Sequence, residues 1–434
     1  MTTLYLAEKA SVARDLASIL GIKSKDVGFW VTPSGDFISN AVGHLVEGLE
    51  PHEYHDEWKK WNLAYLPMVP EVWKVTPHIK TKAQLMLLGK LMKSCDRVVI
   101  ATDAGREGEM IGREILDFFN FKGKIERMWP TNMVLSEMKK ALANLRTDAA
   151  TKPFYEAAKA RRGADWIYGL SMTRAVSIVG NVNGPLPIGR VQTPTLTLLV
   201  NRHKAIVGFK EVTYYELEAK VKTKSGLALT LYHKPAEDKR ILSEREAMGL
   251  ASKAKGAESE LVVTCEPKKQ APPLPFKLST LGKACSSAFG LSAKGTLEVA
   301  QSLYDKRVLT YPRTDSEYLG TEQKSDMPGV IEAVKSTLPV QVEALLKQGT
   351  LFRASLFDDK KLTDHHGIIP TVQAPEGLKE VEMQVYRLVA LQFLRAMGQD
   401  KLYDQTVIKM DANGLEFGTT GNVVTNPGWT SIEF

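Results

Sequence analysis

Short apolar runs alternate with amphipathic stretches through the N-terminal part of the chain. Residues 4–8 (LYLAE) and 97–102 (RVVIAT) have the length and the apolar content of buried strands. Residues 10–20 (ASVARDLASIL) and 107–119 (EGEMIGREILDFF) instead repeat their apolar positions with helical spacing. This alternation predicts an α/β domain with a largely parallel sheet. Residues 51–77, rich in proline and aromatic side chains, are expected to form an ordered excursion from it.

The pattern changes after this region. It is helical over residues 153–200, apart from a glycine- and proline-bearing loop, and it alternates over residues 212–233 as antiparallel strands do. The proline-rich residues 266–275 (EPKKQAPPLP) are predicted to be a stiff linker. Helical periodicity returns before Tyr304 and over residues 383–397, and a strand-like tail follows. A chain of 434 residues is too long for one ordinary core, and the length prior gives about three domains.

Composition and charge narrow the class of protein. Apolar residues make up 44% of the chain and charged residues 25%, as in soluble globular proteins. A net charge of +7 is compatible with nucleic-acid binding, although a basic enzyme with a small acidic substrate fits the charge nearly as well. The three cysteines are scattered, the N-terminus is not a signal peptide, and no apolar run reaches membrane-spanning length. We therefore expect a cytoplasmic protein with no disulfide framework, no zinc ribbon and no membrane partner.

An acidic cluster follows the strand predicted over residues 97–102. Asp103, Glu107 and Glu109 lie in the turn and in the start of the next helix. The carboxyl end of a parallel strand is where open α/β sheets bind ligands, and carboxylates at this density suit Mg²⁺. Acids that complement the dipole of a helix N-terminus give the same pattern, so the motif alone leaves both interpretations open.

Glu8 and Lys9 follow the first predicted strand. At a strand end they could supply a proton donor and a cation for a phosphate. A glutamate–lysine pair is more often a solvated surface feature, so this pair indicates little by itself.

The stretch VLTYPRTDS places Tyr311 at the end of a short apolar run and follows it with Pro312 and Arg313. Proline does not continue a buried strand, because it lacks the backbone donor. The arrangement favours a rigidly held phenol beside a cation that can bind phosphate. Such a phenol is a candidate nucleophile.

Two helical stretches, KARRGADW and IGRVQTPTL, are basic or polar. Their side chains suited to a phosphate backbone are Arg161, Arg162, Arg190 and Gln192. Trp166 is expected to pack within its amphipathic helix rather than to stack on a base.

His365 and His366 are adjacent in the stretch TDHHGIIPT. No third ligand is spaced for zinc, so a hydrogen bond from one histidine to a phosphate oxygen is the preferred interpretation. The sequence has no GxxxxGK[ST] phosphate loop, and any strand chemistry is therefore expected to run without ATP.

Together these stretches resemble the type IA DNA topoisomerases, and most closely the topoisomerase III branch. The matching stretches occur in the family's order along the whole chain: LYLAEKASVARDLA, GHLVEGLEP with KKWNLAYLPMVPEVWK, TDAGREGE, ARRGADW, GRVQTPTL, PLPFKLSTL, GLSAKGTLEVAQSLYDKRVLTYPRTDS and DHHGIIPT.

The resemblance implies a multidomain α/β protein, with an N-terminal TOPRIM (Rossmann-like) domain and the toroidal core of the type IA enzymes. The expected domains are residues 1–148 as TOPRIM, 149–208 as the N-terminal part of a helical single-strand DNA-binding domain, 209–271 with 398–434 as a β-rich hinge domain, and 272–397 as the domain of the catalytic tyrosine. Family cores continue past the stretch NPGWTSIEF, so the core is expected to be shortened at its C-terminus and the β-rich domain to be incomplete.

The resemblance also implies an ATP-independent isomerase. Such an enzyme cuts one DNA strand through a 5′-phosphotyrosine, passes a strand and reseals the break, relaxing negative supercoils or decatenating DNA. Tyr311 is then the nucleophile, Glu8 protonates the leaving 3′-oxygen, and the phosphate contacts are implied at Lys9, Arg313 and His365. The implied Mg²⁺ ligands are Glu8, Asp103 and Glu107. The single-strand DNA groove is implied at Arg161, Arg162, Asp165, Arg190 and Gln192, and the family implies a monomer.

One position departs from the family pattern. The usual acidic signature is Asp-x-Asp-x-Glu, but Gly105 stands at its middle position, so Glu109 or water would have to complete a metal shell. Two other functions stay open. One is a TOPRIM nuclease in which metal-bound water attacks the phosphate. The other is a shortened single-strand DNA-binding protein without strand passage.

Overall fold

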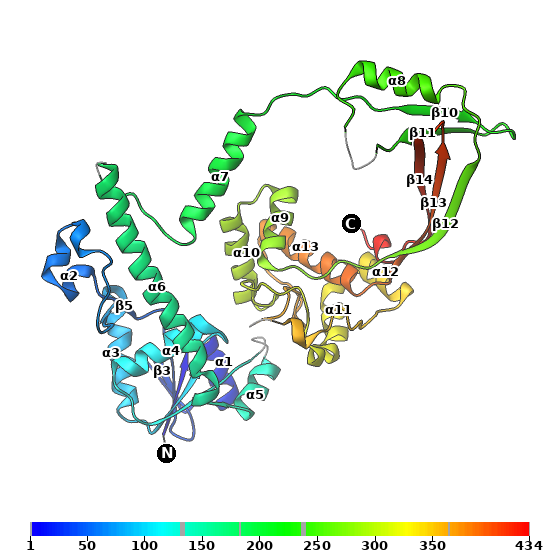
Figure 1. Cartoon of the computed structure of the whole chain (residues 1–434). Coiled ribbons are helices and arrows are strands. Elements are labelled where there is room, and N and C mark those ends of the chain that lie inside the picture. Colours follow the sequence, from blue (N-terminus) through cyan, green and yellow to red (C-terminus); the bar gives the residue numbers. More distant parts are fainter. Residues whose placement is uncertain (1, 131–134, 182–183, 236–239, 363–364, 434) are drawn as a thin grey trace. The chain divides into compact units, whose positions relative to one another are not determined.

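The computed structural model describes residues 2–130, 135–181, 184–235, 240–362 and 365–433. The chain divides into two units, each assembled from separate stretches of sequence (Figure 1). The first unit contains Met1–His203, Phe276–Gly320 and Asp358–Tyr386, and the second contains Lys204–Pro275, Thr321–Phe357 and Arg387–Phe434.

The first unit is built on a seven-stranded sheet of order β2-β3-β4-β1-β7-β8-β9. The central strands run parallel: β4 (Phe37–Asn40), β1 (Thr3–Ala7), β7 (Arg97–Ala101) and β8 (Lys124–Arg127). The outer strands pair antiparallel with their neighbours: β2 (Ser24–Asp26), β3 (Phe29–Val31) and β9 (Arg146–Thr147). The predicted α/β domain with a largely parallel sheet is confirmed.

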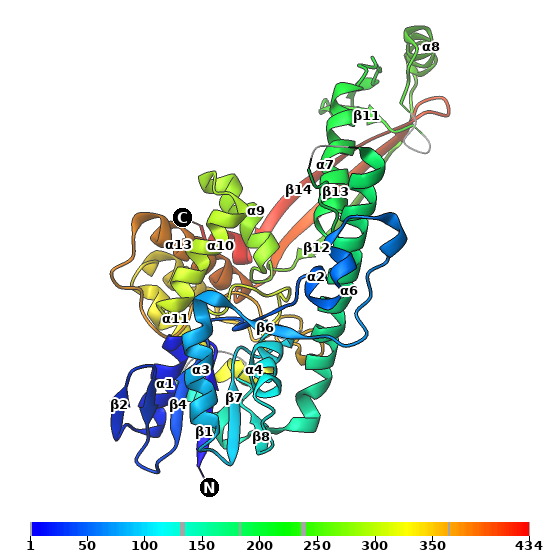
Figure 2. The ribbon, with the colours of Figure 1, turned by 90° about the vertical axis from the view of Figure 1, so that its left-hand side faces the viewer.

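Helices cover both faces of this sheet (Figure 1 and Figure 2). On one face lie α3 (Lys82–Met92) and α4 (Arg106–Phe118), and on the other α1 (Ala10–Leu20) and α5 (Leu135–Ala143). Successive side chains of a strand point to opposite faces, so β1 contributes Leu4 and Leu6 to one core and Tyr5 and Ala7 to the other. This explains why β1 is apolar at every position, as a parallel strand buried on both faces requires.

Residues 51–77 form the ordered excursion that was predicted. A two-stranded ribbon of β5 (Val46–Gly48) and β6 (Val75–Pro77) encloses α2 (Pro51–Tyr54) and two 3-10 turns, Asp56–Lys59 and Leu63–Tyr65. A third such turn, Ile79–Thr81, leads into α3. The rings of Tyr54, Trp58 and Trp73 pack around Trp166, with ring centroids 5.5–6.4 Å from that indole.

The predicted helical region consists of α6 (Asp148–Gly180) and α7 (Gln192–Val207). α6 is anchored on α4, because the Tyr155 hydroxyl donates to Asp117 at 2.6 Å and Arg113 pairs with Asp148 at 2.6 Å.

The segment that carries Tyr311 follows a helix pair, α9 (Leu278–Phe289) and α10 (Ala293–Asp305). The short apolar run before the tyrosine is not a strand, because it forms only an isolated bridge between Leu309 and Pro370. The pairing stays short because neither Pro370 nor Pro312 has the backbone N–H that a longer ladder would need. The Thr310 N–H still donates to the Ile369 carbonyl at 3.0 Å, so the backbone is fixed.

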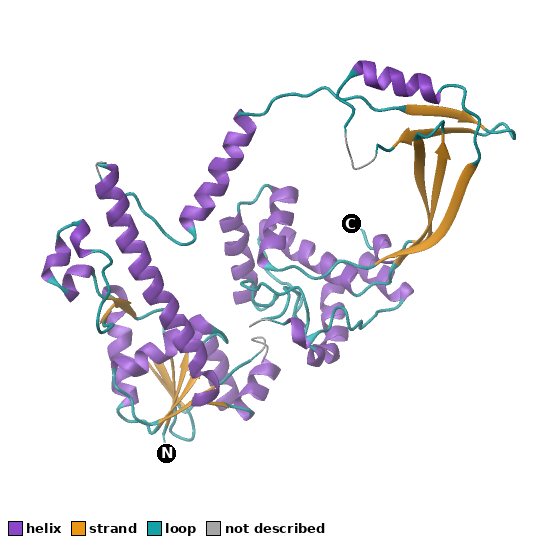
Figure 3. Ribbon diagram, in the orientation of Figure 1, coloured by secondary structure: helices purple, strands orange, loops and turns teal. Residues whose placement is uncertain are grey.

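The second unit holds a five-stranded antiparallel sheet of order β10-β11-β14-β13-β12 (Figure 3). Its strands are β10 (Glu218–Lys222), β11 (Ala228–His233), β12 (Leu261–Gln270), β13 (Lys401–Asp411) and β14 (Glu416–Asn426). Its helices are α8 (Glu244–Ala254), α11 (Met327–Lys335), α12 (Pro339–Gln348) and the later part of α13 (Glu380–Ala396). Short 3-10 turns occur at Thr321–Asp326 and Gly428–Ser431, and another in the first unit at Asp359–Lys361.

The predicted linker over residues 266–275 is wrong in its first half. Residues up to Gln270 belong to β12, which pairs with β13 along its whole length. Pro267 is tolerated because β12 is an edge strand, where a missing N–H can face away from the ladder.

Candidate functional site

The carboxyl ends of β1 and β7 bring Glu8 and Asp103 together. Ala7 is in register with Ala101, so the residues just beyond them meet at the same edge of the sheet. The Asp103 N–H donates to Glu8 Oε2 at 3.2 Å, and Lys9 Nζ lies 3.2 Å from Asp103 Oδ2 and 3.9 Å from Glu8 Oε1. Three of the predicted site residues therefore form one contiguous group.

Two features fix the Asp103 turn. A Cβ at Gly108 would lie 1.9 Å from the Asp103 carbonyl oxygen, so only glycine lets α4 approach this closely. The buried Arg127 guanidinium donates to the carbonyls of Thr102 and Asp103, at 2.8 and 2.6 Å, and pairs with Glu109 at 3.1 Å. Arg127 was not predicted. The only sequence signal for it is a charged residue at the end of a short strand-like run.

Tyr311 lies against this group. Its ring centroid is 4.5 Å from that of His365 and 5.3 Å from that of Tyr304, and Lys9 Nζ is 5.7 Å from the centroids of both tyrosines. Tyr304 was not predicted as a site residue. It lies near the end of a helix, where the sequence does not distinguish a site tyrosine from an ordinary core side chain.

Burial sets the protonation of the site. Burial, and then the Asp103 carboxylate, raise the pKa of Glu8, while Lys9 opposes the shift. Burial also raises the pKa of Tyr311, reinforced by Asp103 and Glu8 and opposed by Arg313. Both groups consequently hold their protons more tightly than in water.

Arg313 is exposed, two residues beyond Tyr311. His366 is buried, its Nδ1–H donates to the Gly367 carbonyl at 2.8 Å, and burial lowers its pKa to about 4. His366 is therefore neutral, and His365 is the histidine at the tyrosine. The preceding Thr363 and Asp364 lie outside the described residues.

The predicted metal ligands are only partly assembled. Glu8 and Asp103 are adjacent, but the exposed Glu107 faces His44, with Oε2 3.6 Å from Nε2. Glu109 is fully buried, and its two oxygens pair with Arg127 and Arg113. Within the described ranges no three His, Cys, Asp or Glu side chains form a metal-binding group.

One atom of the site nevertheless fits a cation. Asp103 Oδ1 is buried and has no hydrogen-bond partner among the described residues. An unpaired buried carboxylate oxygen is costly, and Glu8 supplies a second oxygen-bearing side chain beside it. Mg²⁺ is commonly held by one or two carboxylates, with water and phosphate oxygens completing its shell.

The predicted DNA-contacting residues lie on α6 and at the start of α7. Asp165 pairs with Arg190 and lies 3.8 Å from Arg161 Nε, and all three are well exposed. Arg162 pairs with Glu114, which also contacts His44 Nδ1 at 3.3 Å and raises the pKa of that histidine. Gln192, the first residue of α7, is exposed.

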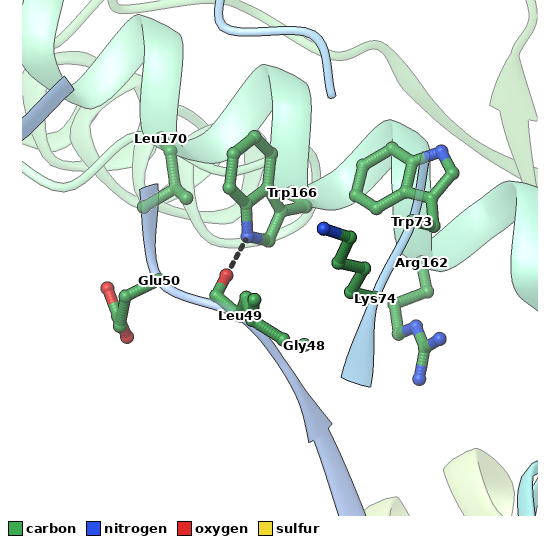
Figure 4. Close-up of a pocket in the computed structure, with 8 residues that line it drawn as sticks. All are labelled: Gly48, Leu49, Glu50, Trp73, Lys74, Arg162, Trp166 and Leu170. Atoms are coloured by element: carbon green, nitrogen blue, oxygen red, sulfur yellow. Dashed lines mark hydrogen bonds between the residues drawn. The ribbon is translucent and has the colours of Figure 1, made fainter. Parts of the chain in front are cut away.

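A cavity of about 240 Å³ lies between the β5–β6 ribbon and α6 (Figure 4). Its walls include the indoles of Trp73 and Trp166 and the cations of Lys74 and Arg162. The Trp166 N–H donates to the Leu49 carbonyl at 3.2 Å, so this indole is packed, as expected, and also forms part of the cavity wall.

Within the described part of the chain, no helix combines the length and the apolar character needed to cross a bilayer.

Two family models match successive parts of the chain. The Toprim domain matches residues 3–133, and the DNA topoisomerase family matches residues 149–434. The Toprim domain is a metal-binding fold. A structural relative, full-length topoisomerase I from Thermotoga maritima, superposes with a TM-score of 0.69 over 99% of this chain and 67% of that one, at 21% identity. This likeness confirms the predicted fold class.

Curated relatives are closer in sequence. DNA topoisomerase 3 of Vibrio cholerae is 33% identical over 99% of this chain and 70% of its own length. DNA topoisomerase 3 of Bacillus subtilis is 34% identical over 99% of this chain and 59% of its own length. The chain thus spans between about three fifths and seven tenths of these relatives. It belongs to the DNA topoisomerase family and is similar to the topoisomerase III branch of the type IA enzymes.

Proposed function

We propose that the chain is an ATP-independent type IA topoisomerase that cuts one DNA strand through Tyr311. The observation that supports this most strongly is the meeting of Tyr311 with Lys9 and His365, beside the adjacent carboxyl groups of Glu8 and Asp103.

In the proposed reaction the Tyr311 oxygen attacks a backbone phosphorus, and the bond from phosphorus to the 3′-oxygen breaks. The phenolic proton leaves to water, and Glu8 donates a proton to the departing 3′-oxygen. The raised pKa of Glu8 favours this donor role, because it keeps the carboxyl protonated to a higher pH. The phosphotyrosine conserves the energy of the phosphodiester, so the reverse reaction reseals the strand without a nucleotide.

Cations around the phenol stabilise the phosphate. Lys9 is already placed by Asp103, and Arg313 lowers the pKa of Tyr311 against the effect of burial. We propose that Asp103 holds Mg²⁺, that Glu8 joins it as a ligand only in its ionised form, after it has given up its proton, and that Glu107 approaches only by leaving His44. When bound, such an ion neutralises negative charge on the phosphate and favours the ionised phenol.

We propose that single-stranded DNA follows α6 toward this site. Arg161, Arg162, Asp165, Arg190 and Gln192 lie along its path, and the cavity beside Trp166 has rings and cations suited to one unpaired base. The four-domain division predicted from the sequence, strand passage and a monomeric state are part of the same proposal.

The test uses 3′-labelled single-stranded DNA with Mg²⁺, quenched with denaturant. We expect label on the protein band in the parent chain, none in Tyr311→Phe, and much less when EDTA is added. The label must be 3′, because a 5′-phosphotyrosine keeps the fragment with the original 3′ end. Cleaved DNA free of protein, and equally abundant in Tyr311→Phe, would instead indicate a metal-dependent nuclease.

A further inference from the structure

One ion pair joins the two stretches of chain that build the proposed cleavage site. Asp15, on α1, pairs with Arg307, which lies between α10 and Tyr311. This pair links Met1–His203 to Phe276–Gly320. Apart from the contacts of Tyr304 and Tyr311, it is the one hydrogen-bonded or ionic link between these two stretches among the described residues.

Asp15 is rigidly connected to the catalytic group. α1 begins directly after Lys9, its N-cap residue, and Asp15 lies on the buried side of this helix with 6% of its surface exposed. Burial raises the pKa of the Asp15 carboxyl, and Arg307 opposes the shift. If Arg307 withdrew, a largely buried carboxylate would lose its partner, which is strongly unfavourable.

Arg307 is held in an unusual conformation. Its φ of +64° lies in the left-handed region, which costs free energy for a residue other than glycine. The Arg307 N–H donates to the Tyr304 carbonyl at 2.8 Å, and its carbonyl accepts from the Thr371 hydroxyl. The turn therefore connects the ion pair to Tyr304 on one side and to the Tyr311 segment on the other.

The neighbouring cation has a different partner. Lys306 pairs at 2.6 Å with Glu382, on α13 rather than on α1, and Ser302 donates to the same carboxylate at 2.6 Å. Of these two consecutive cations, only Arg307 reaches across to α1. Lys306 is consequently a matched control for the loss of one positive charge in this turn.

We propose that Asp15 and Arg307 form a latch that holds the Tyr311 segment against α1 during cleavage and opens to let a strand pass. The proposal rests on the function proposed above. After cleavage one DNA end is covalently bound to Tyr311, whereas Glu8 acts on the 3′-oxygen of the other end. A strand can pass only if these two parts of the site separate, and the latch opposes that separation.

The direct test measures the separation itself in the full chain. Spin labels are attached at Ile22→Cys, an exposed position just after α1, and at Lys294→Cys, an exposed position on α10. Cys265, which is exposed, is replaced by serine, and Cys95, whose pKa burial raises to about 11, reacts slowly. The distance distribution is recorded without DNA, at low and high salt.

We expect Asp15→Asn and Arg307→Asn to raise the ratio of separated to closed molecules by about 5- to 30-fold, the factor that one or two kcal/mol represents. Asparagine is chosen at Arg307 because it tolerates the left-handed backbone. Lys306→Gln should leave the ratio unchanged. Added salt should separate the parent chain but have little effect on either latch variant.

Equal distributions in the parent chain and both latch variants would overturn the latch. The covalent-adduct assay on the same proteins keeps the two proposals distinct. Adduct with unchanged distances would refute the latch alone, whereas no adduct in any protein would refute the proposed function, and the DNA-free distances would still decide the latch.

Discussion

At Glu8, burial and the neighbouring Asp103 carboxylate raise the pKa of a side chain that the proposed reaction needs as a proton donor. A buried carboxyl with a raised pKa is unfavourable for folding once it ionises. The site therefore trades stability for chemistry, as active sites commonly do.

This trade predicts that Glu8→Gln stabilises the protein while abolishing cleavage. The folded pKa lies above the unfolded one, so the stabilising contribution of the protonated form is complete at low pH and is lost as pH rises through the folded pKa. A neutral glutamine avoids that loss. We expect the thermal midpoint of Glu8→Gln to exceed that of the parent by about 2–4 °C at neutral to alkaline pH, and the two to converge in acid.

Glu332→Gln, at an exposed position on α11, is the matched control and should leave the midpoint unchanged. Differential scanning calorimetry from acid to alkaline pH checks both variants. A Glu8→Gln protein that is less stable than the parent at alkaline pH would show that the charged form of Glu8 is favoured in the folded state.

At the scale of elements, the turn between β7 and α4 positions Asp103 by close packing. Gly108→Ala would press a methyl group against the Asp103 carbonyl, with a contact of 1.9 Å before relaxation. We expect this change to destabilise the fold by about 1–3 kcal/mol, as overpacking does, and to reduce Mg²⁺-dependent adduct by displacing Asp103.

Gly282→Ala is the control for this prediction. Gly282 also lies inside a helix, α9, but nothing occupies the space within 4 Å of its added Cβ. It should be neutral or stabilising by about 0.5–1 kcal/mol, since alanine favours a helix. Urea unfolding and the adduct assay compare the two, and equal effects would argue against the close packing of Gly108 on Asp103.

The elements that the sequence predicts well are those whose pattern is local. β1, α1, β7 and α4 have apolar periodicities that need no information from elsewhere in the chain, and all four form where expected. The linker prediction failed because Pro267 and its neighbours favour a linker when only the local sequence is considered. The structure of residues 266–270 is decided instead by pairing with β13, more than a hundred residues later.

The same distinction explains the site. Glu8, Asp103 and Tyr311 stand in recognisable motifs, and the structure brings them together. Tyr304 and Arg127 were missed because their importance arises only from contacts with distant residues, namely Lys9 over the Tyr304 ring and the carbonyls around Arg127. The pairing of Glu107 with His44 is equally invisible in the sequence.

At the scale of the whole molecule, the net charge of +7 matters where cations gather along the proposed DNA path. Arg190→Gln removes one exposed guanidinium of this path. In the parent chain this guanidinium pairs with Asp165, so a bound phosphate would compete with that carboxylate for it. We expect weaker binding of single-stranded DNA and a salt dependence, log Kd against log salt, that falls by about 0.7 in slope. Fluorescence anisotropy over a salt series measures both.

Lys335→Gln, at an exposed position on α11 in the second unit, serves as the control and should not alter the slope. If Arg190→Gln and Lys335→Gln change binding equally, the path along α6 is wrong, and the affinity comes from overall charge instead.

The central claim is that Tyr311 becomes covalently joined to DNA, and mass spectrometry of the adduct tests it most directly. The protein is trapped on single-stranded DNA with Mg²⁺, digested with trypsin and nuclease, and searched for a peptide that carries a residual nucleotide. We predict the nucleotide on Tyr311, in the peptide that follows Arg307. A nucleotide on Tyr304 or on any other residue, or abundant cleavage with no linked peptide, would contradict the account.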